Sequence, residues 1–373
     1  GACTSGTGAS ERRSNASSSD TVVLEHVESE AATFRVVRVV DRLAHPWSVA
    51  WLPDERMLIT ERPGRLVLVD GATSTTIGGL PTIAARGQGG LLDVALPPNY
   101  ASTGWIYFTY SAAGDGGMGT TLARARLADS SLTDLETLYQ QTPFVEGGRH
   151  SGSRIVFPGD GTVLFGIGDR GQRDPAQDKI NTIGSILRLN LDGSIPNDNP
   201  FVGRDDVRPA IYSYGHRNPQ GMALHPETGV LWEHEHGPRG GDELNMIDAG
   251  ANYGWPNVTY GREYSDNSPI GETEAPGVKQ PVTYWIPSIA PSGMAFYTGD
   301  RFPEWENNIF IGALAQQHIR RVVLDGSEVT HQEEVLRNEL GRIRDVRTGP
   351  DGFLYVLTDA EEGALYRLEP VDG

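Results

Sequence analysis

Short hydrophobic runs, each introduced by a proline-containing turn, recur along this chain. The turns are of a Pro-acidic-Gly type, and the runs after them are rich in Val, Ile, Leu, Tyr and Phe, which predicts β-strands. Six variants of this phrase occur, at residues 52–61, 96–110, 157–165, 225–232, 302–311 and 349–356. A second hydrophobic run often follows, as at 64–69 and 364–368, so each phrase is expected to open a hairpin.

Six repeats of unequal spacing predict an all-β fold, a six-bladed β-propeller whose longest inserts follow the third and fourth repeats. The alternative is a large β-sandwich, which does not need the same turn before every second strand. Residues 34–40 are expected to pair with the last blade and close the ring, which removes exposed sheet edges. We assign residues 21–373 to the propeller and residues 1–20 to a flexible polar tail.

The tail contains the single cysteine, Cys3, so an internal disulfide is excluded. The polar, low-complexity run after Cys3 cannot bury a core. This arrangement is typical of a bacterial lipoprotein start, and the alternative is an accidental cysteine in a disordered tail. No later run approaches the roughly eighteen apolar residues of a membrane span. We therefore expect an exported protein, periplasmic or at the cell surface, with a lipid anchor at Cys3.

The net charge of the chain limits the classes of partner that it can bind. The formal net charge is −18, and binding to nucleic acid relies on a basic surface. The sequence therefore argues against a nucleic-acid partner, and it does not suggest an anionic membrane surface either.

Two loop segments, 214–221 and 235–245, combine a cation, an amide, an acidic cluster and Gly/Pro corners where no strand or helix period continues. Gly and Pro can aim carbonyl oxygens at a hard cation. Arg217 and Asn218 offer a guanidinium fork and an amide to a carboxylated or quinoid ligand. The alternative is a pair of polar loops that satisfy only their own backbone, although turn chemistry alone does not require all these groups together.

Seven motifs occur in order, at residues 87–93, 149–154, 168–171, 215–221, 254–256, 290–293 and 341–346, and the fourth lies in the first of these two loops. With these motifs and the six repeats, residues 34–370 resemble the soluble pyrroloquinoline quinone (PQQ)-dependent sugar dehydrogenases, and in particular the aldose sugar dehydrogenase branch. The resemblance implies a quinoprotein that oxidises aldose sugars at the anomeric carbon to lactones and transfers hydride to PQQ. It does not identify the electron acceptor or the preferred sugar.

The resemblance also implies roles for individual residues. His150 matches the general base that takes the proton of the anomeric hydroxyl, a task that suits an imidazole titrating near neutrality. Arg217 is implied beside the quinone as a second catalytic residue. Sugar contacts are implied for Gln88, Arg149 and Trp285. The alternatives are a satisfied turn histidine at position 150 and a loop-capping amide at position 88.

PQQ carries three carboxylates and an ortho-quinone, so its pocket should supply several cations. Arg342 and Arg344 match the pair that holds carboxylates, and residues two apart on a strand face the same way. The alternative for this pair is a solvated surface stripe. The whole implied cofactor set is Gln88, His150, Arg217, Asn218, Arg342 and Arg344.

Calcium is implied at two places. The backbone carbonyls of Gly237 and Pro238 match the ligands of the ion that polarises the quinone, and carbonyl oxygen suits a hard cation. A second, structural calcium is implied at the Glu243 side chain and the Tyr253 backbone. Glu243 could instead be an ordinary turn acid.

Two positions depart from the family pattern. Ala315 stands where the family usually has a lysine that meets a cofactor carboxylate, so PQQ binding should be weaker unless Gln316, His318 or Arg320 compensates. Arg149 stands where the glucose-specific enzymes carry aspartate, which favours broad aldose use over strict glucose selectivity.

Two other classes of protein stay open. A calcium-dependent propeller lactonase would not need Arg342 and Arg344. A non-catalytic cell-surface propeller that binds glycans or proteins would keep the blades without the site. Because His150 and the arginines are all present, the sequence favours the dehydrogenase.

Overall fold

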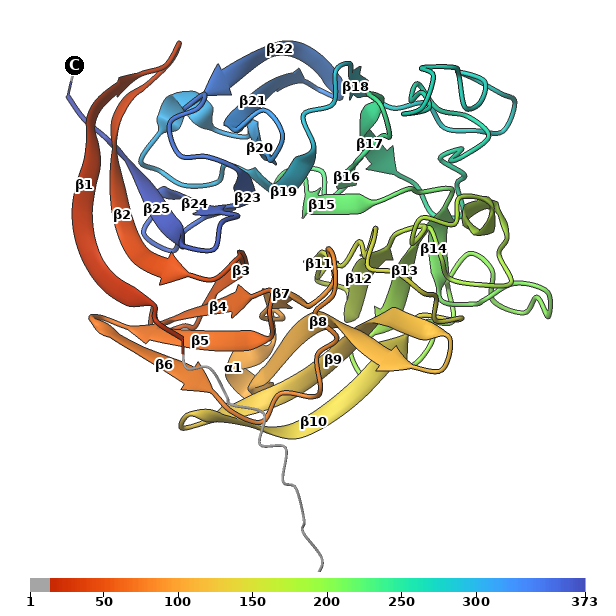
Figure 1. The fold of residues 1–373 in the computed structure, drawn as a ribbon, viewed down its shortest axis with the longest axis horizontal. Coiled ribbons are helices and arrows are strands. Elements are labelled where there is room, and N and C mark those ends of the chain that lie inside the picture. Colours follow the sequence, from red (N-terminus) through yellow and green to blue (C-terminus); the bar gives the residue numbers. More distant parts are fainter. Residues whose placement is uncertain (1–13, 373) are drawn as a thin grey trace, which may run out of the picture.

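The structure is a computed structural model that describes residues 14–372, so Cys3 and most of the expected tail lie outside the described part. The chain forms six β-sheets arranged as blades around a central axis (Figure 1). The predicted six-bladed β-propeller is therefore confirmed. No helix among the described residues is long and apolar enough to cross a membrane.

The blades are numbered by the position of their innermost strands along the chain, and the strands of each blade are given from the innermost strand outward. Blade 1 contains β3 (Pro46–Trp51), β4 (Met57–Glu61), β5 (Arg65–Asp70) and β6 (Thr73–Ile77). Blade 2 contains β7 (Leu91–Ala95), β8 (Trp105–Gly114), β9 (Gly117–Ala128) and β10 (Ser131–Gln140), with the helix α1 (Tyr100–Thr103) between β7 and β8. Blade 3 contains β11 (Ile155–Val156), β12 (Thr162–Ile167), β13 (Ser185–Asn190) and β14 (Ile211–Tyr214).

The second half repeats the same order. Blade 4 contains β15 (Pro219–Leu224), β16 (Leu231–Glu235), β17 (Asp242–Ile247) and β18 (Thr283–Trp285). Blade 5 contains β19 (Pro291–Phe296), β20 (Ile309–Ala313), β21 (His318–Asp325) and β22 (Glu328–Val335). Blade 6 contains β23 (Ile343–Thr348), β24 (Leu354–Thr358), β25 (Gly363–Pro370), β2 (Thr33–Leu43) and β1 (Ser17–Glu28). Two 3₁₀ turns, Asp174–Gln177 and Pro303–Trp305, lie in loops.

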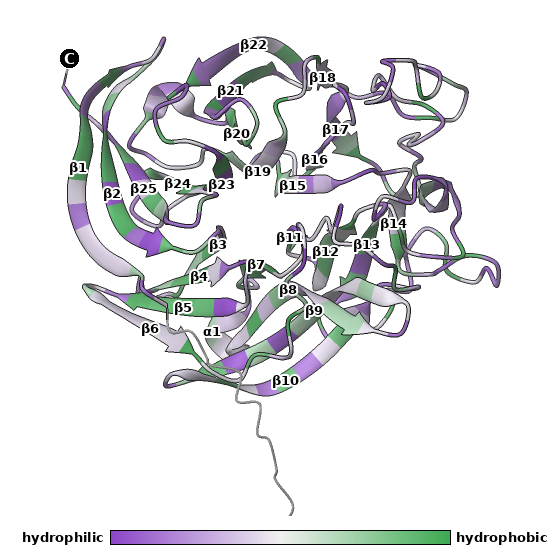
Figure 2. Ribbon diagram, in the orientation of Figure 1, coloured by the Kyte–Doolittle hydropathy of each residue, from purple (hydrophilic) through white to green (hydrophobic). Residues whose placement is uncertain are grey.

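The repeated sequence phrase has one structural meaning. In every blade it forms the turn from the innermost strand to the second strand, as residues 52–56 do between β3 and β4. Because strands buried on both faces are continuously apolar, β5 shows as a hydrophobic stretch in Figure 2. Because each phrase joins the innermost strand of a blade to its second strand, all six turns lie at the same side of the ring.

The ring closes between the two ends of the chain. Strand β2 pairs antiparallel with β25, with Val36 opposite Leu368, which confirms the pairing expected for residues 34–40. The innermost strands contact one another in a closed series, β3 to β7, β11, β15, β19, β23 and back to β3. The pairing of β2 with β25 places both ends of the chain in one blade and so closes the ring.

The expected boundary of the tail needs a correction. Strand β1 begins at Ser17 and pairs with β2 as the outermost strand of blade 6, so residues 17–20 belong to the sheet. The polar composition of this segment hid the strand, because an outer strand buries little. Val23, Leu24 and Val27 are the hydrophobic side chains of β1 that pack against the blade.

Aromatic side chains fill the contact between blades 5 and 6. Phe34, Phe302 and Trp305 are fully buried, and the rings of Phe302 and Trp305 stack with centroids 4.2 Å apart. Large buried rings contribute strongly to packing. This packing makes the ring of blades rigid, and the loops that precede each innermost strand are held in fixed positions.

Candidate active site

A cavity of about 430 Å³ lies where the innermost strands begin. Because all blades share one strand order, the residues that precede these strands meet at one end of the central axis. Four of the predicted site residues line the cavity: Gln88, Asn218, Arg342 and Arg344. Residues 217–218 come directly before β15, residues 87–88 and 150–151 come a few positions before β7 and β11, and the arginines stand at the start of β23. The ring thus brings together residues that are more than 250 positions apart.

His150 lies beside this cavity with its backbone in the left-handed region, at φ 53°. That conformation is uncommon for a residue with a side chain and is often found at functional sites. The Gln88 side chain helps to hold it, because Gln88 Oε1 accepts a hydrogen bond from the His150 backbone N–H at 3.0 Å. The imidazole is buried, with the residue 7% exposed.

The His150 ring is oriented by Asp169, whose Oδ1 lies 2.6 Å from Nδ1. Asp169 Oδ2 accepts a hydrogen bond from the Trp255 indole N–H at 2.7 Å, so both carboxylate oxygens are fixed. With Nδ1–H donating to the carboxylate, Nε2 keeps its lone pair and can accept a proton.

The electrostatics of the dyad favour a neutral imidazole beside a carboxylate. Burial lowers the pKa of His150, and Asp169 opposes this effect only in part while Arg217 adds to it. Burial alone would raise the pKa of Asp169, but the hydrogen bond and charge of His150, together with Arg217, hold it below its usual range. His150 is therefore ready to act as a base at neutral pH.

Two further residues position the loop that carries His150. Arg170 is buried and donates from Nε to the Arg149 carbonyl at 2.8 Å and from Nη2 to the Gly147 carbonyl at 2.6 Å. Gly168 has no room for a side chain, because the carbonyls of His150 and Arg217 pack against it. These contacts bring the two predicted catalytic residues together.

Arg217 lies between the dyad and the predicted calcium ligands. Its Nη1 donates to the carbonyls of His236 at 3.2 Å and Gly237 at 3.0 Å, and its guanidinium sits 5.3 Å from the Trp255 ring centre. Asn218 uses its Oδ1 to accept from the Gly152 N–H at 3.3 Å. Its Nδ2 donates no hydrogen bond within residues 14–372, which leaves a donor for a ligand.

One wall of the cavity is cationic. Arg344 donates from Nη2 to Asp359 at 2.9 Å, and Arg342 Nε lies 3.8 Å from the same carboxylate. Arg62 also lines the cavity. Burial alone would raise the pKa of Asp359, but Arg344, His45 and Arg62 lower it to about 2. Three guanidinium groups thus face the cavity against one carboxylate.

The loop with the predicted carbonyl ligands is held by Asp242. Its Oδ1 accepts from the Gly237 N–H at 2.8 Å, and its carboxylate also accepts from Ser288. The Gly237 carbonyl accepts one hydrogen bond, from Arg217, and a carbonyl oxygen has two lone pairs. Pro238 follows in the same turn, packed on Gly261.

A buried acidic cluster surrounds the second predicted calcium residue. Glu233, Glu235 and Glu243 project from the same face of β16 and β17, and Asn245 Nδ2 donates to Glu233 at 3.0 Å and to Glu243 at 3.2 Å. Burial and the charge of Glu235 raise the pKa of Glu233 and of Glu243. Glu233 Oε1 and Asn245 Oδ1 have no hydrogen-bond partner in the described chain.

His216 joins this cluster to Tyr253. Its Nδ1 lies 2.8 Å from Glu235 Oε2, and its ring stacks on that of Tyr253 with centroids 5.0 Å apart. Ligand atoms of His216, Glu233 and Glu235 lie within 4.8 Å of one another. The structure thus places Glu243 and Tyr253 in one region, together with Glu233 and Glu235, for which no role was predicted.

Trp285 does not line the cavity. It is 6% exposed in the outer strand β18, packs in a hydrophobic cluster and donates its indole N–H to Gln332 at 2.8 Å. The expected sugar contact of Trp285 therefore stays a prediction. Arg149, by contrast, is exposed next to His150, with its guanidinium against Gly171.

The residues expected to compensate for Ala315 are engaged elsewhere. Arg320 donates to Glu334 at 3.2 Å, to Gln332 at 3.3 Å and to His318 at 3.2 Å, all away from the cavity. Gln316 donates to the Ser288 carbonyl at 3.3 Å. Ala315 itself is exposed and follows Leu314, which lines the cavity.

Several site residues were not assigned a role from the sequence: Trp47, Arg62, Asp169, Gln220, Trp255, His236 and Asp359. Asp169, Gln220 and Trp255 lie within the motifs 168–171, 215–221 and 254–256, so position in a motif was the available signal. Arg62 and Asp359 come from the ends of hairpins in blades 1 and 6 and gave no such signal.

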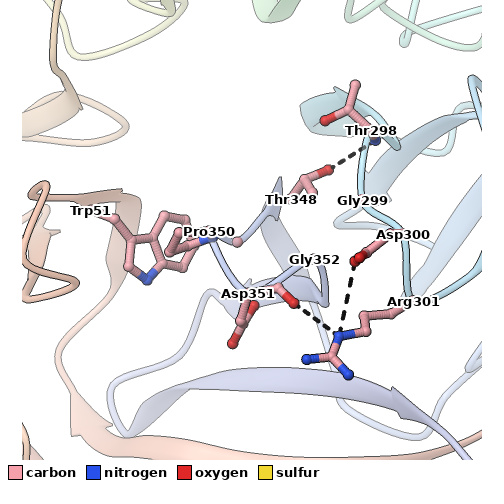
Figure 3. A pocket seen from close by; sticks show the side chains of 10 residues that line it. Trp51, Thr298, Gly299, Asp300, Arg301, Thr348, Pro350, Asp351 and Gly352 are labelled. Carbon is pink, nitrogen blue, oxygen red and sulfur yellow. Dashed lines mark hydrogen bonds and ion pairs between the residues drawn. The ribbon is translucent and has the colours of Figure 1, made fainter.

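A larger hollow of about 770 Å³ lies at the other end of the ring (Figure 3). It is lined by turns between innermost and second strands, including Trp51 and residues 298–301 and 348–352. Figure 3 shows Arg301 directed at Asp300 and at the Asp351 carbonyl. None of the predicted site residues lies there.

Comparison with known proteins gives a consistent result. The family model described as glucose / sorbosone dehydrogenase matches residues 43–367. The aldose sugar dehydrogenase YliI of Escherichia coli (strain K12) is 46% identical over 348 residues, covering 91% of this chain and 94% of that protein. The apo-form crystal structure of the soluble aldose sugar dehydrogenase from Escherichia coli is 45% identical, with a TM-score of 0.88 over 91% of this chain and 100% of that one.

A more distant structure contains a cofactor. It is the PQQ-bound form of aldose sugar dehydrogenase from Streptomyces coelicolor, 26% identical, with a TM-score of 0.73 over 95% of this chain and 99% of that one. Since the family model matches most of the chain, this protein belongs to the glucose / sorbosone dehydrogenase family.

Proposed function

We propose that this protein is a PQQ-dependent dehydrogenase that oxidises aldose sugars at the anomeric carbon to lactones. The observation that carries the proposal is the His150–Asp169 dyad, with Nδ1 and Oδ1 2.6 Å apart, beside a cavity with an arginine-lined wall. The base provides for proton removal, and the cationic wall provides for an anionic cofactor. Membership of the family supports both assignments.

The chain's own groups account for the proton in this reaction. The anomeric hydroxyl gives its proton to His150 Nε2, while the hydrogen on the same carbon leaves with its electron pair. The carbon–oxygen bond becomes the lactone carbonyl, so the sugar loses two electrons and two hydrogens. Asp169 stabilises the imidazolium that forms, because its carboxylate accepts from Nδ1–H.

The cavity residues fit PQQ by charge and by donor type. When bound, PQQ supplies the quinone that accepts the hydride. Arg342 and Arg344 would hold its carboxylates, and Asn218 Nδ2 and Arg217 would serve its oxygen atoms. Trp47 also lines this cavity, and the Arg154 guanidinium lies over its ring, 3.8 Å from the ring centre.

Calcium fits beside Arg217. The carbonyls of Gly237 and Pro238 are the proposed ligands, and the Gly237 carbonyl retains a lone pair after accepting from Arg217. Asp242 fixes this turn through the Gly237 N–H. A hard cation here would polarise an adjacent ligand oxygen.

A second calcium fits the acidic cluster of Glu233, Glu235 and Glu243, with the Tyr253 backbone. Three buried carboxylates without a cation are costly, and the unpartnered Glu233 Oε1 and Asn245 Oδ1 are oxygen ligands of the kind that calcium binds. This ion would have a structural role.

The rival functions fit less of the site. A propeller lactonase has no use for the wall formed by Arg62, Arg342 and Arg344. A glycan-binding or protein-binding propeller has no use for a histidine held in the left-handed region against a carboxylate. Neither alternative is favoured by a specific contact.

The test is reconstitution. Purified protein is stripped with a chelator, titrated with PQQ in calcium buffer, and assayed by dye reduction with several aldoses. We expect saturable PQQ binding, then sugar-dependent dye reduction with several sugars, and release of lactone. Absence of PQQ binding in calcium buffer by folded protein would contradict the proposal, whereas binding without sugar oxidation would favour a non-catalytic role.

We also propose that the protein is exported and anchored through a lipid on Cys3. The support is the polar low-complexity run after Ala2-Cys3, which suits a tether. Mass spectrometry of the amino-terminal peptide from membrane fractions tests this. A diacylglyceryl group on Cys3, and release of the protein by Cys3→Ser, are expected; an unmodified Cys3 thiol contradicts it.

A further inference from the structure

Arg62 stands at the end of β4, in the turn toward β5, and its backbone is clamped between two blades. Its N–H donates to the His45 carbonyl at 3.0 Å, and its carbonyl accepts from the Leu91 N–H at 3.0 Å. Gly90 packs so closely on this carbonyl that no larger residue fits there. The start of the Arg62 side chain is therefore fixed at the cavity.

The Arg62 guanidinium has unused hydrogen-bonding capacity. The side chain is 20% exposed and lines the cavity. Its Nη1 lies 3.8 Å from Asp359 Oδ1, which is beyond hydrogen-bond distance. Within residues 14–372 the guanidinium donates no hydrogen bond.

Arg344, on the same wall, differs in this respect. Its Nη groups donate to Asp359 at 2.9 Å and to Gln220 and Ser292 at 3.3 Å each. Asp359 thus takes its short hydrogen bonds from Arg344 and His45 and leaves Arg62 with a charge contact only. A mostly buried guanidinium with free donors is costly unless a ligand accepts from it.

We propose that Arg62 binds a carboxylate of PQQ and is the third arginine of the cofactor wall, with Arg342 and Arg344. This inference rests on the proposed function. Ala315 brings no charge to the cavity, and Arg320 is engaged with Glu334. A planar guanidinium with free donors matches a carboxylate in bidentate geometry. Arg62 therefore supplies the positive charge that the sequence lacks at position 315.

The test measures equilibrium PQQ affinity by fluorescence titration in calcium buffer, without sugar. The variants are Arg62→Gln and Arg62→Lys, and the control is Arg56→Gln, a nearby arginine that pairs with Asp54 and does not line the cavity. The same titrations are run with PQQ trimethyl ester, which has no carboxylate charge. Thermal unfolding of each apoprotein checks the fold.

We expect Arg62→Gln to raise the PQQ dissociation constant about tenfold to a hundredfold, the usual effect of losing hydrogen bonds to a charged group. The ester should bind to this variant and to the unmodified protein within about threefold. Arg62→Lys should lie between, since an ammonium keeps the charge but not the fork. Arg56→Gln should bind like the unmodified protein.

Two results would overturn the inference. One is an unchanged PQQ affinity in folded Arg62→Gln. The other is an equal loss of affinity for PQQ and for the ester, which would mean that Arg62 only shapes the cavity. If Arg62→Gln does not fold, Arg62→Lys decides by the same comparison. Failure of the unmodified protein to bind PQQ would instead count against the proposed function itself.

Discussion

The side chains of His150 and Asp169 are joined by a hydrogen bond of 2.6 Å between Nδ1 and Oδ1. His150 precedes the innermost strand of blade 3, whereas Asp169 follows the second strand of the same blade. The bond fixes one tautomer of the imidazole and leaves Nε2 as the free base. It links the fold to the chemistry, because it depends on two loops that meet at the same end of one blade.

Replacing His150 with alanine should remove sugar oxidation and leave PQQ binding nearly intact. The imidazole acts on the substrate proton, and loss of a general base typically reduces the rate about 10² to 10⁴-fold. Steady-state dye reduction and PQQ titration of the same sample measure the two effects separately. His26→Ala, on the outer strand β1, is the control and should behave like the unmodified protein. A His150→Ala variant with full turnover would exclude the assigned role.

Asp169→Asn should keep the fold but lower turnover by about 10²-fold or more. The amide can donate to Nδ1, which would place the proton on Nε2 and remove the base. Substrate affinity should change little, because Asp169 is buried behind the imidazole. The comparison of kcat with KM shows this split. A rise in KM at constant kcat would mean that Asp169 shapes the sugar site instead.

The acid limb of the pH profile should lie below the ordinary histidine pKa of about 6.5. Burial lowers the pKa of His150, so the neutral, active form persists as the pH falls, and kcat/KM is lost only when the pH passes through the lowered pKa. Asp169 opposes this shift, so Asp169→Asn should move the limb further down. Measurement of kcat/KM from pH 4 to 8 tests this, and a limb above 6.5 contradicts it.

Much of the fold could be predicted from the sequence, because every blade has the same turn motif before its second strand. Strand β1 was missed since Ser17–Glu28 is polar and lies on the outside of blade 6. The site was predicted where motifs are local, as for His150 and Asn218. Arg62 and Asp359 could not be found in this way, because only ring closure brings blades 1 and 6 together at the cavity. Trp285 does not line the cavity, and its sugar contact stays a prediction, because a tryptophan after an insert gives no sign of which way its ring points.

Calcium should raise the melting temperature of the protein, and Glu243→Gln should reduce this rise. No lysine or arginine of residues 14–372 forms an ion pair with Glu233, Glu235 or Glu243, and a ligand present at about 100 times its dissociation constant stabilises the fold by about 2.7 kcal/mol. Thermal unfolding with chelator and with calcium measures the effect. Identical melting temperatures in both buffers would contradict the proposal of a structural calcium. If PQQ reconstituted sugar oxidation in excess chelator, this result would contradict the proposal of a calcium at Gly237 and Pro238.

Ala315→Lys should tighten PQQ binding more in the Arg62→Gln background than in the unmodified protein. An ammonium at the exposed position 315 adds about 1 to 3 kcal/mol where it reaches a carboxylate, but Arg62 already supplies one charge. Titrations of the two single variants and the double variant give the coupling. Equal gains in both backgrounds would mean that positions 62 and 315 serve different carboxylates.

The most direct test of the central claim is anaerobic single turnover of the PQQ-loaded protein with an aldose that carries deuterium on the anomeric carbon. If the anomeric hydrogen leaves as hydride while His150 takes the hydroxyl proton, the bound quinone should be reduced by one equivalent of sugar, lactone should appear in equal amount, and deuterium should slow the step severalfold. His150→Ala should bind PQQ and not be reduced on this timescale. A PQQ-loaded, calcium-replete protein whose quinone stays oxidised with every aldose tested would contradict the account.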